Sequence, residues 1–375
     1  MNPIKVGLST TMIEPLLTGG RLDGIGVYTQ ALRQYLPGFG CQVQGFLFPP
    51  LSHPGARAYR SGQAMRYPYE VTAMLDWAKP YAMPMDVVHV TDYRVVRMDC
   101  PVVATLHDAV PIKFPHWVTP RLRGLKNWAQ KKAARKADRV IALSHYAVTE
   151  LVECFGVDPA RISVVYCGVD DHWRTPVASQ DVAATLQQFG LQPGYFLFVG
   201  TLQPRKNVER IVQAWQALPQ ALRQQHPLVI VGRAGWQCET LLQQMKAAQQ
   251  QGEPLHWLNN VAEQTALRHL YAGALAFVFP SLYEGFGIPV VEAFAAKVPV
   301  ITANTTSLPE VSLGAALEVD PLSVDEIRHA MQNLAQDESL RQRCIDAGWQ
   351  RVATLTWQAT AEQTAAVYRA ALAGR

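Results

Sequence analysis

Short apolar runs alternate along the chain with longer amphipathic stretches. In the first half, helical periodicity marks 25–36, 121–137 and 144–156, where Ser144 can cap the last helix. The apolar runs predict strands at 5–10, 41–48, 86–92, 101–108, 139–143 and 162–168. Because strands that alternate with helices form parallel sheets, this half predicts an open α/β sheet.

A polar stretch at 169–194 breaks the pattern and predicts an interdomain linker with one short helix. The alternation then restarts, with strands at 195–200, 228–232, 255–261, 276–281 and 299–304, and helices at 208–218, 239–250, 264–274, 287–296 and 324–335. From Glu338 onward the pattern is helical throughout, with Trp349 and Trp357 as anchors.

These two halves predict two doubly wound, Rossmann-like α/β domains. We expect a first domain at 1–175 that binds an acceptor, a second at 176–350 that binds a nucleotide sugar, and a C-terminal helix at 351–375 that packs back on the first. The length of 375 residues agrees with two cores rather than one. In open parallel sheets, ligands bind outside the carboxyl ends of the strands, so we expect the site in a cleft between the domains.

The composition excludes several other classes of protein. Hydrophobic residues make up 49% of the chain and charged residues 17%, as in a folded protein. The six cysteines form no CxxC pair, so neither a disulfide scaffold nor a structural metal site is indicated, and no Asp-x-Asp metal motif stands in a convincing loop. We expect no metal and no cofactor. The beginning lacks a signal-peptide pattern and no run of about 18 apolar residues occurs, which predicts a cytoplasmic protein.

The net charge of +4 conceals an uneven distribution. Residues 1–175 carry 20 Lys+Arg against 14 Asp+Glu, whereas residues 176–375 carry 14 against 16. The segment 121–139 is the most basic, with 8 Lys or Arg among 19 residues. It is either a solvated helix face that covers its domain with Leu122, Leu125, Trp128 and Ala133, or a helix that binds anionic lipid at the inner face of the cytoplasmic membrane. Nucleic acid is not indicated, because no nucleic-acid-binding motif accompanies the charge.

Residues 279–301 form the strongest local motif. A strand ends at Pro280, a turn carries Glu284, Gly285, Phe286 and Gly287, and a helix begins near Ile288 with Pro289 in its first turn. The first amides of a helix and two glycines suit a phosphate. Glu292 lies eight residues beyond Glu284. The two carboxylates are therefore expected to hold separate hydroxyl-bearing parts of one ligand, such as a sugar.

Two further motifs follow predicted strands. After the strand at 195–200, Gly200 precedes the adjacent cations Arg205 and Lys206, which can neutralise a diphosphate, and Asn207 is placed to cap the next helix. In the first domain, His107 and Asp108 lie at the carboxyl end of a strand. Taken singly, these residues also fit a hydrogen-bonded strand-end pair or solvated surface charge.

Together these motifs resemble glycosyltransferase family 4, whose members are retaining nucleotide-sugar enzymes with the two-domain GT-B fold. The resemblance implies that Glu284 contacts the donor sugar, Glu292 binds the ribose, and Arg205 and Lys206 neutralise the leaving diphosphate. It also implies that His107 lies near the transferred sugar. Gly24 and Gly26, in a loop after the first strand, would approach the donor phosphates, although a Gly-x-Gly is commonly only a helix-entry turn.

Within the family, the stretches HDAVPIKFP and GTLQPRKN look most like bacterial mannosyl- and rhamnosyltransferases of polysaccharide or O-antigen assembly. The resemblance thus implies transfer of a hexose, with GDP-mannose or a GDP-deoxyhexose as the first expectation, to a saccharide or lipid-linked saccharide. Two other classes remain open. A sugar-nucleotide epimerase of the same fold would need no acceptor, and a non-catalytic membrane-surface protein would bind no donor.

Overall fold

The computed structural model describes residues 2–20, 22–48, 60–64, 79–117, 123–261 and 263–374. The chain divides into two compact units. Unit 1 comprises Met1–Pro115, Pro120–Gly168 and Trp357–Arg375, and unit 2 comprises His116–Thr119 and Val169–Thr356. The second unit thus begins before the expected boundary at 176, and the chain returns to the first unit at Trp357.

Unit 1 is built on a seven-stranded sheet in the order β3-β2-β1-β4-β5-β6-β7, in which each pair of neighbouring strands is parallel. The strands are β1 (Ile4–Ser9), β2 (Cys41–Leu47), β3 (Gln63–Ala64), β4 (Val87–Val90), β5 (Val102–Thr105), β6 (Arg139–Ala142) and β7 (Ile162–Val164). The order reverses direction between β1 and β4, which marks a topological switch point. β3 was not predicted, because two residues are too short to show a period.

Helices occur in unit 1 where periodicity predicted them, at 25–36, 121–137 and 144–156, and several short helices were not predicted. The helices of this unit are η1 (Thr11–Ile13), α1 (Pro15–Thr18), α2 (Gly24–Tyr35), η2 (Leu36–Phe39), α4 (Val110–Lys113), α5 (Arg123–Ala134), α6 (His145–Glu150), η4 (Leu151–Phe155) and η5 (Pro159–Arg161). The turn η3 (Pro115–Trp117) follows α4, and its last two residues are assigned to unit 2. Ser144 caps α6 as predicted, since its hydroxyl accepts a hydrogen bond from the amide of Ala147 at 3.1 Å.

Unit 2 contains a six-stranded parallel sheet in the order β10-β9-β8-β11-β12-β13, with its switch point between β8 and β11. The strands are β8 (Tyr195–Val199), β9 (Leu228–Val231), β10 (Leu255–Leu258), β11 (Ala274–Phe279), β12 (Val300–Ala303) and β13 (Leu317–Val319). β13 was missed, because its three residues include the charged Glu318. β8, β9, β11 and β12 are lined by buried apolar side chains, which accounts for their continuous apolar sequences.

The helices of unit 2 are α7 (Asp171–Arg174), α8 (Ser179–Gln188), η6 (Pro204–Lys206), α9 (Val208–Gln216), α10 (Gln220–Gln225), α11 (Glu239–Gln250), α12 (Gln264–Ala272), α13 (Ile288–Ala295), α14 (Leu308–Ser312), α15 (Val324–Gln336) and α16 (Glu338–Val352). The predicted linker therefore holds two helices, α7 and α8, rather than one. α8 packs on α12, so this stretch is part of unit 2.

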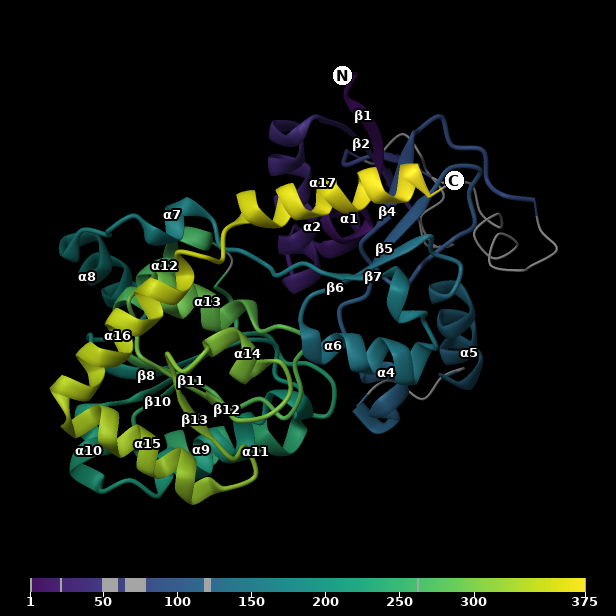
Figure 1. Ribbon diagram of the computed structural model, residues 1–375. Coiled ribbons are helices and arrows are strands. Elements are labelled where there is room, and N and C mark those ends of the chain that lie inside the picture. Colours follow the sequence, from purple (N-terminus) through teal and green to yellow (C-terminus); the bar gives the residue numbers. More distant parts are fainter. Residues whose placement is uncertain are drawn as a thin grey trace. The chain divides into compact units, whose positions relative to one another are not determined.

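The C-terminal segment is not one continuous helix. α16 packs on α13 and α15 in unit 2, and α17 (Trp357–Ala373) packs on α2 and η2 in unit 1 (Figure 1). The prediction of unbroken helix from Glu338 is wrong at 353–356, because the chain passes there from one unit to the other. Trp357 and Tyr368 of α17 are completely or almost completely buried.

Candidate active site

The carboxyl end of β8 presents the two predicted cations. Gly200 follows β8, and η6 carries Arg205 and Lys206; we call residues 204–206 the cation turn. Only 8% of Lys206 is exposed, and its ammonium nitrogen lies 4.6 Å from the centre of the Phe279 ring. The ring face attracts the cation, but a buried ammonium also requires an anionic partner.

Glu284 is that partner. β11 neighbours β8 across the switch point, and residues 281–287 after β11, which we call the glutamate loop, bring the carboxylate to the cation turn. Oε2 of Glu284 accepts a hydrogen bond from Nη1 of Arg205 at 3.0 Å, and Oε1 accepts one from Nζ of Lys206 at 2.6 Å. The cluster therefore combines two positive charges with one negative charge at the switch point, where Rossmann-like sheets bind ligands.

The charges in this cluster control the protonation of Glu284. Burial by itself would raise the pKa of this carboxyl, but the charges and hydrogen bonds of Lys206 and Arg205 outweigh burial and hold the pKa below its ordinary value. Glu284 is therefore ionised at neutral pH. The cluster keeps a net positive charge, which can attract a diphosphate and still offer carboxylate oxygens to sugar hydroxyls.

Two glycines let the segments after β8 and β9 approach each other closely. Gly232 has φ +149°, and a Cβ atom there would lie 1.9 Å from the carbonyl oxygen of Gly200. Any side chain at position 232 would push Gly200 and the residues that lead to the cation turn out of place. Glycine at position 232 is therefore a packing requirement of the candidate site. Gly200 itself has φ +155°, a backbone conformation that residues with a side chain rarely adopt.

The glutamate loop is held in place by the backbone conformation of Gly287 and by hydrogen bonds to its backbone carbonyl oxygens. Gly287 adopts φ +106° at the start of α13, where a Cβ atom would lie 2.8 Å from Cδ2 of Leu308. The hydroxyl of Ser307 lies 2.9 Å from the carbonyl oxygen of Glu284 and 3.1 Å from that of Phe286, and it donates to them. Gly285 and Phe286 are buried within this loop. α13 has Pro289 in its first turn, as predicted, and no side chain caps it.

Glu292 lies in a different environment from Glu284. Its Oε2 accepts a hydrogen bond from the hydroxyl of Tyr271 at 3.3 Å, and the ring of Trp173 packs edge-on against Tyr271. Burial raises the pKa of Glu292 to about 7; the nearby charge of Asp170 adds to the rise and the Tyr271 bond opposes it. The two glutamates thus differ in their protonation near neutral pH.

In unit 1, His107 lies two residues beyond the end of β5. Its Nε2–H donates to the carbonyl oxygen of Thr91 at 2.9 Å, and the ring of Tyr28 packs against it edge-on at 5.3 Å. Burial lowers the pKa of His107, although the bond to Thr91 and the charge of Asp108 act in the opposite direction. A neutral imidazole with its proton on Nε2 leaves Nδ1 as a hydrogen-bond acceptor.

The alternative of a hydrogen-bonded His107–Asp108 pair does not hold. The Asp108 carboxylate instead accepts from the hydroxyl of Tyr93 at 2.7 Å and from the amide of Val110 at 3.1 Å. Asp108 therefore fixes the start of α4, and His107 is oriented by Thr91 and Tyr28.

Gly24 and Gly26 are in the first turn of α2, not in a loop after β1, so that expectation was wrong. The short helices η1 and α1 lie between β1 and α2. Asp23 caps α2, because its carboxylate accepts from the amide of Gly26 at 2.9 Å. A Cβ atom at Gly26 would lie 2.8 Å from the carbonyl oxygen of Met12, which explains the glycine by packing. The contact of these glycines with donor phosphates stays a prediction.

The basic segment is partly described. Residues 121 and 122 lie outside the described residues, as does the side chain of Leu125, so their part in covering the domain is not described. Ala133 is completely buried, as the solvated-face interpretation expects. Trp128, however, is 52% exposed and does not cover the domain, and Nζ of Lys132 lies 5.3 Å from the centre of its ring.

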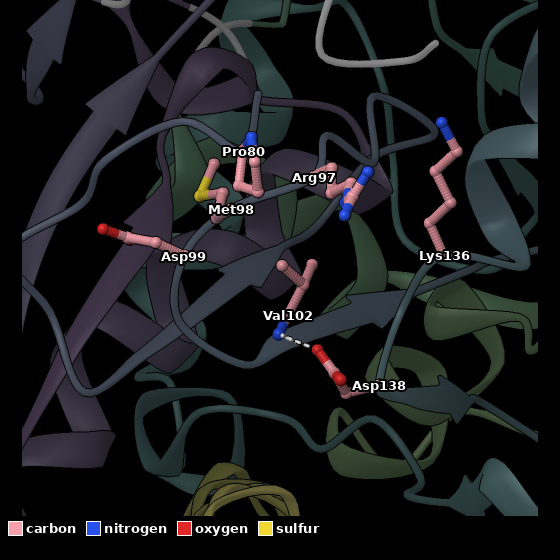
Figure 2. Close-up of a pocket in the computed structure, with 7 residues that line it drawn as sticks. All are labelled: Pro80, Arg97, Met98, Asp99, Val102, Lys136 and Asp138. Carbon is pink, nitrogen blue, oxygen red and sulfur yellow. Dashed lines mark hydrogen bonds between the residues drawn. The ribbon is translucent and has the colours of Figure 1, made fainter. Parts of the chain in front are cut away.

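A surface pocket of about 420 Å³ lies in unit 1, beside the end of the basic segment. It is lined by Pro80, Arg97, Met98, Asp99, Val102, Lys136 and Asp138 (Figure 2). Val102 begins β5 and Asp138 precedes β6, so the pocket lies at the amino ends of these strands, opposite the edge that carries His107.

Within the described ranges, no three or more His, Cys, Asp or Glu residues gather in a way that could hold a metal ion. No described helix is both long and apolar enough to cross a membrane.

Comparison with known proteins agrees with this arrangement. A family model described as "Glycosyltransferase Family 4" matches residues 22–173, and one described as "Glycosyl transferases group 1" matches residues 186–351. The chain is 34% identical over 272 residues to the O-antigen chain mannosyltransferase B of Escherichia coli, covering 71% of this chain and 70% of the relative. This chain belongs to glycosyltransferase family 4. It is an enzyme of the glycosyltransferase class.

Other similar proteins show how widely this family's scaffold is used. The chain is 32% identical over 309 residues to a glycogen synthase of Mycobacterium tuberculosis, covering 77% of this chain and 70% of that one. The crystal structure of Anabaena HepE in complex with UDP-glucose matches with a TM-score of 0.73 at 17% identity, over 99% of this chain and all of that chain. The fold is therefore GT-B, as the sequence predicted.

For this family 4 chain, sequence patterns located Arg205, Lys206 and Glu284 but missed the residues that hold them. Ser307, which bonds the carbonyl oxygen of Glu284, lies outside every predicted helix and strand, and no motif marks it. Tyr271, which bonds Glu292, looked like an ordinary residue of the predicted helix at 264–274. Asn207 is the N-cap residue of α9, as predicted, but its side chain makes no capping hydrogen bond. Its amide instead donates to the carbonyl oxygens of Pro280 and Pro321. The only signal in the sequence was an asparagine directly after two cations, because its burial is visible only in the structure.

Proposed function

We propose that this family 4 enzyme transfers a hexose, with retention of configuration, from a nucleoside diphosphate sugar to a saccharide or lipid-linked saccharide in the synthesis of a cell-surface polysaccharide or lipopolysaccharide. The observation that carries the proposal is the cluster of Arg205, Lys206 and Glu284 at the switch point of unit 2. A net positive cluster beside a helix start suits a departing diphosphate.

The reaction breaks the bond between C1 of the sugar and the phosphate oxygen, and it forms a bond between C1 and the acceptor hydroxyl oxygen on the same face. The acceptor proton passes to an oxygen of the leaving diphosphate, so that no protein nucleophile is required. Arg205 and Lys206 stabilise the negative charge that develops on the diphosphate, and Glu284 accepts hydrogen bonds from the sugar. We propose that this needs neither a metal ion nor a cofactor.

Unit 1 would receive the acceptor. His107 offers Nδ1 toward a sugar hydroxyl, because Thr91 holds the proton on Nε2. Glu292, with the hydroxyl of Tyr271 beside it, would bind the ribose hydroxyls of the donor.

We propose mannose as the transferred sugar and GDP-mannose as the donor, with a GDP-deoxyhexose such as that of rhamnose as the other choice. The similarity to an O-antigen mannosyltransferase supports mannose. A thermal-shift panel of GDP-, UDP- and dTDP-sugars tests the base, because a ligand that binds only the folded state raises the unfolding temperature. Stabilisation by UDP- or dTDP-sugars alone would overturn the choice of GDP.

The catalytic assignment is tested by Glu284→Ala and Lys206→Ala. We expect each to lower kcat/KM by about 100-fold or more, as for other groups that stabilise developing charge. Lys246→Ala, at an exposed lysine of the same unit, is the matched control and should keep full activity. Circular dichroism checks that the variants fold. Full turnover by both site variants would show that the site is elsewhere.

We further propose that the enzyme works in the cytoplasm at the inner face of the membrane, held by the basic segment 121–139. The support is the exposed Trp128 beside Lys132, since an aromatic ring and basic residues together suit an anionic lipid surface. Near such a surface each basic residue contributes about 1 kcal/mol.

Cosedimentation with liposomes tests this position. Lys131→Glu with Lys132→Glu should lower binding to vesicles that contain phosphatidylglycerol by about tenfold or more, since two charges are reversed. Lys246→Glu with Arg343→Glu, which makes the same change of charge in unit 2, should leave binding much less affected. Equal losses in both double variants would refute a local membrane-binding segment.

A further inference from the structure

Asn207 directly follows the cation turn and has an unusual backbone conformation. Its φ is +60°, in the left-handed region that asparagine tolerates better than most residues. The residue is 3% exposed, and its backbone amide donates to the carbonyl oxygen of Pro204 at 3.1 Å. The cation turn is thus followed by a left-handed residue whose side chain makes no capping hydrogen bond to the amides of α9.

The side chain of Asn207 joins three segments. Nδ2 donates to the carbonyl oxygen of Pro280 at 2.9 Å and to that of Pro321 at 2.6 Å, while Oδ1 accepts from Nη1 of Arg210 at 2.9 Å. Carbonyl oxygens only accept hydrogen bonds, so these partners determine which end of the amide is nitrogen. Every hydrogen of the amide is used, and the side chain is buried, as expected of a well-satisfied internal clamp.

The positions of the two prolines show which segments the Asn207 side chain joins. Pro280 follows β11 and leads into the glutamate loop, and Pro321 follows β13. A second hydrogen bond joins the cation turn to the glutamate loop directly, because the amide of Leu282 donates to the carbonyl oxygen of Arg205 at 2.8 Å. Hydrogen bonds to the segment that holds the glutamate loop therefore lie on both sides of Lys206, at the carbonyl oxygen of Arg205 before it and at the side chain of Asn207 after it.

We propose that Asn207 is a positioning residue, whose side-chain amide holds Arg205 and Lys206 where a diphosphate meets them. The inference rests on the proposed function, because it takes the two cations to be the diphosphate site. It adds a residue that touches neither substrate nor the reacting atoms. Long cationic side chains stabilise a leaving group best when their backbone is already in place, since no reorganisation is then needed during the reaction.

Titration with GDP and GMP separates positioning from a general role in the fold. The ratio of the two dissociation constants isolates the β-phosphate, which the cations are proposed to bind. Asn207→Gly keeps the left-handed backbone and removes the clamp; Asn207→Asp keeps the size but turns a carboxylate toward two carbonyl oxygens. We expect both variants to weaken GDP binding by about tenfold or more, from the loss of two buried hydrogen bonds, and to change GMP binding less than about threefold.

Two further variants make the result unambiguous. Leu313→Gly is the matched control, because Leu313 also has a positive φ, +48°, but is 71% exposed; it should bind both nucleotides as the wild type does. Lys206→Ala should lose the preference for GDP. If Lys206→Ala keeps that preference, the proposed diphosphate site is wrong, which is separate from the present inference.

The remaining outcomes bear on Asn207 alone. If Lys206→Ala loses the preference for GDP while both Asn207 variants keep it, Asn207 does not position the cations and the inference is overturned. It is also overturned if both Asn207 variants unfold, since Asn207 would then belong to the fold. If only one folds, its GDP-to-GMP ratio decides. UDP and UMP replace the guanine nucleotides if the wild type binds uridine nucleotides instead.

Discussion

At the scale of single residues, the pKa values of two glutamates eight positions apart are shifted in opposite directions. Glu284 is buried beside two cations, and its pKa lies below the ordinary value. Glu292 has no cation among the groups that shift it, and burial raises its pKa to about 7. The difference follows from partners: a buried carboxylate is stabilised by nearby positive charge, and without it the carboxyl keeps its proton to higher pH.

This difference predicts a pH-dependent stability for Glu292. Between pH 4.5, its ordinary pKa, and pH 7 the folded state holds a proton that the unfolded state has lost, so the stabilising contribution falls as pH rises through this window. Because glutamine does not titrate, the Glu292→Gln variant does not lose stability in this way as pH rises. We expect the variant to gain stability relative to the wild type, by at most about 3 kcal/mol, between pH 4.5 and pH 8. Urea unfolding across this range measures it; a constant difference would mean that Glu292 titrates normally.

At the scale of elements, the site depends on how closely the segments after neighbouring strands approach. The backbones of Gly200 and Gly232 pack directly on each other beyond β8 and β9. The bridge between Leu202 and Ala234 continues this contact toward the cation turn. Glycine at position 232 is thus required by the packing of two loops, and through them it supports the position of Arg205 and Lys206.

Gly232→Ala tests this contact. We expect this substitution to lower the free energy of unfolding by at least about 2 kcal/mol more than backbone strain alone would, because the new methyl group overlaps the carbonyl of Gly200. Gly252→Ala is the control for strain, since Gly252 has φ +78° with no atom within 4 Å of the added Cβ, and should cost only about 1 kcal/mol. Equal changes in the urea midpoints of the two variants would contradict the packing argument.

At the scale of the whole chain, the last helix completes the first unit. In a buried network, the hydroxyl of Tyr368 in α17 lies 2.7 Å from Nδ1 of His89, whose Nε2 lies 2.8 Å from the hydroxyl of Thr105. The Thr105 hydroxyl also lies 2.9 Å from that of Tyr28, whose ring packs on His107. Burial lowers the pKa of His89 to about 3, so the network is neutral at physiological pH. The C-terminus therefore supports the candidate site of unit 1.

Deletion of residues 357–375 tests this dependence. It would remove Trp357 and Tyr368 from the core of unit 1 and leave His89 with a buried, unpaired nitrogen. We expect peptides from β4, β5 and α2 to lose protection in hydrogen exchange, while peptides from β8 and β11 in unit 2 keep theirs. Unchanged protection in β4 and β5 would mean that unit 1 is stable without its last helix.

Much of this could be predicted from local patterns. Alternating apolar and amphipathic runs located nearly every strand, because a buried parallel strand needs a continuous apolar sequence wherever it lies in the sheet. The candidate site residues Arg205, Lys206 and Glu284 were singled out because they follow such strands. The failures were also local: β3 and β13 are too short to show a period, and the four residues between α16 and α17 carry no strong helix-stop signal.

By itself, the sequence determined the two α/β units, the resemblance to family 4 and the residues that carry the site's charge. Tertiary structure alone decided that Lys206 pairs with Glu284, 78 residues away, that the side chain of Asn207 clamps rather than caps, and that Tyr368 reaches His89, 279 residues away. The reason is physical. Periodicity records only whether a residue faces an apolar core, whereas hydrogen bonds and pKa values depend on which polar atoms the order of the strands brings together in that core.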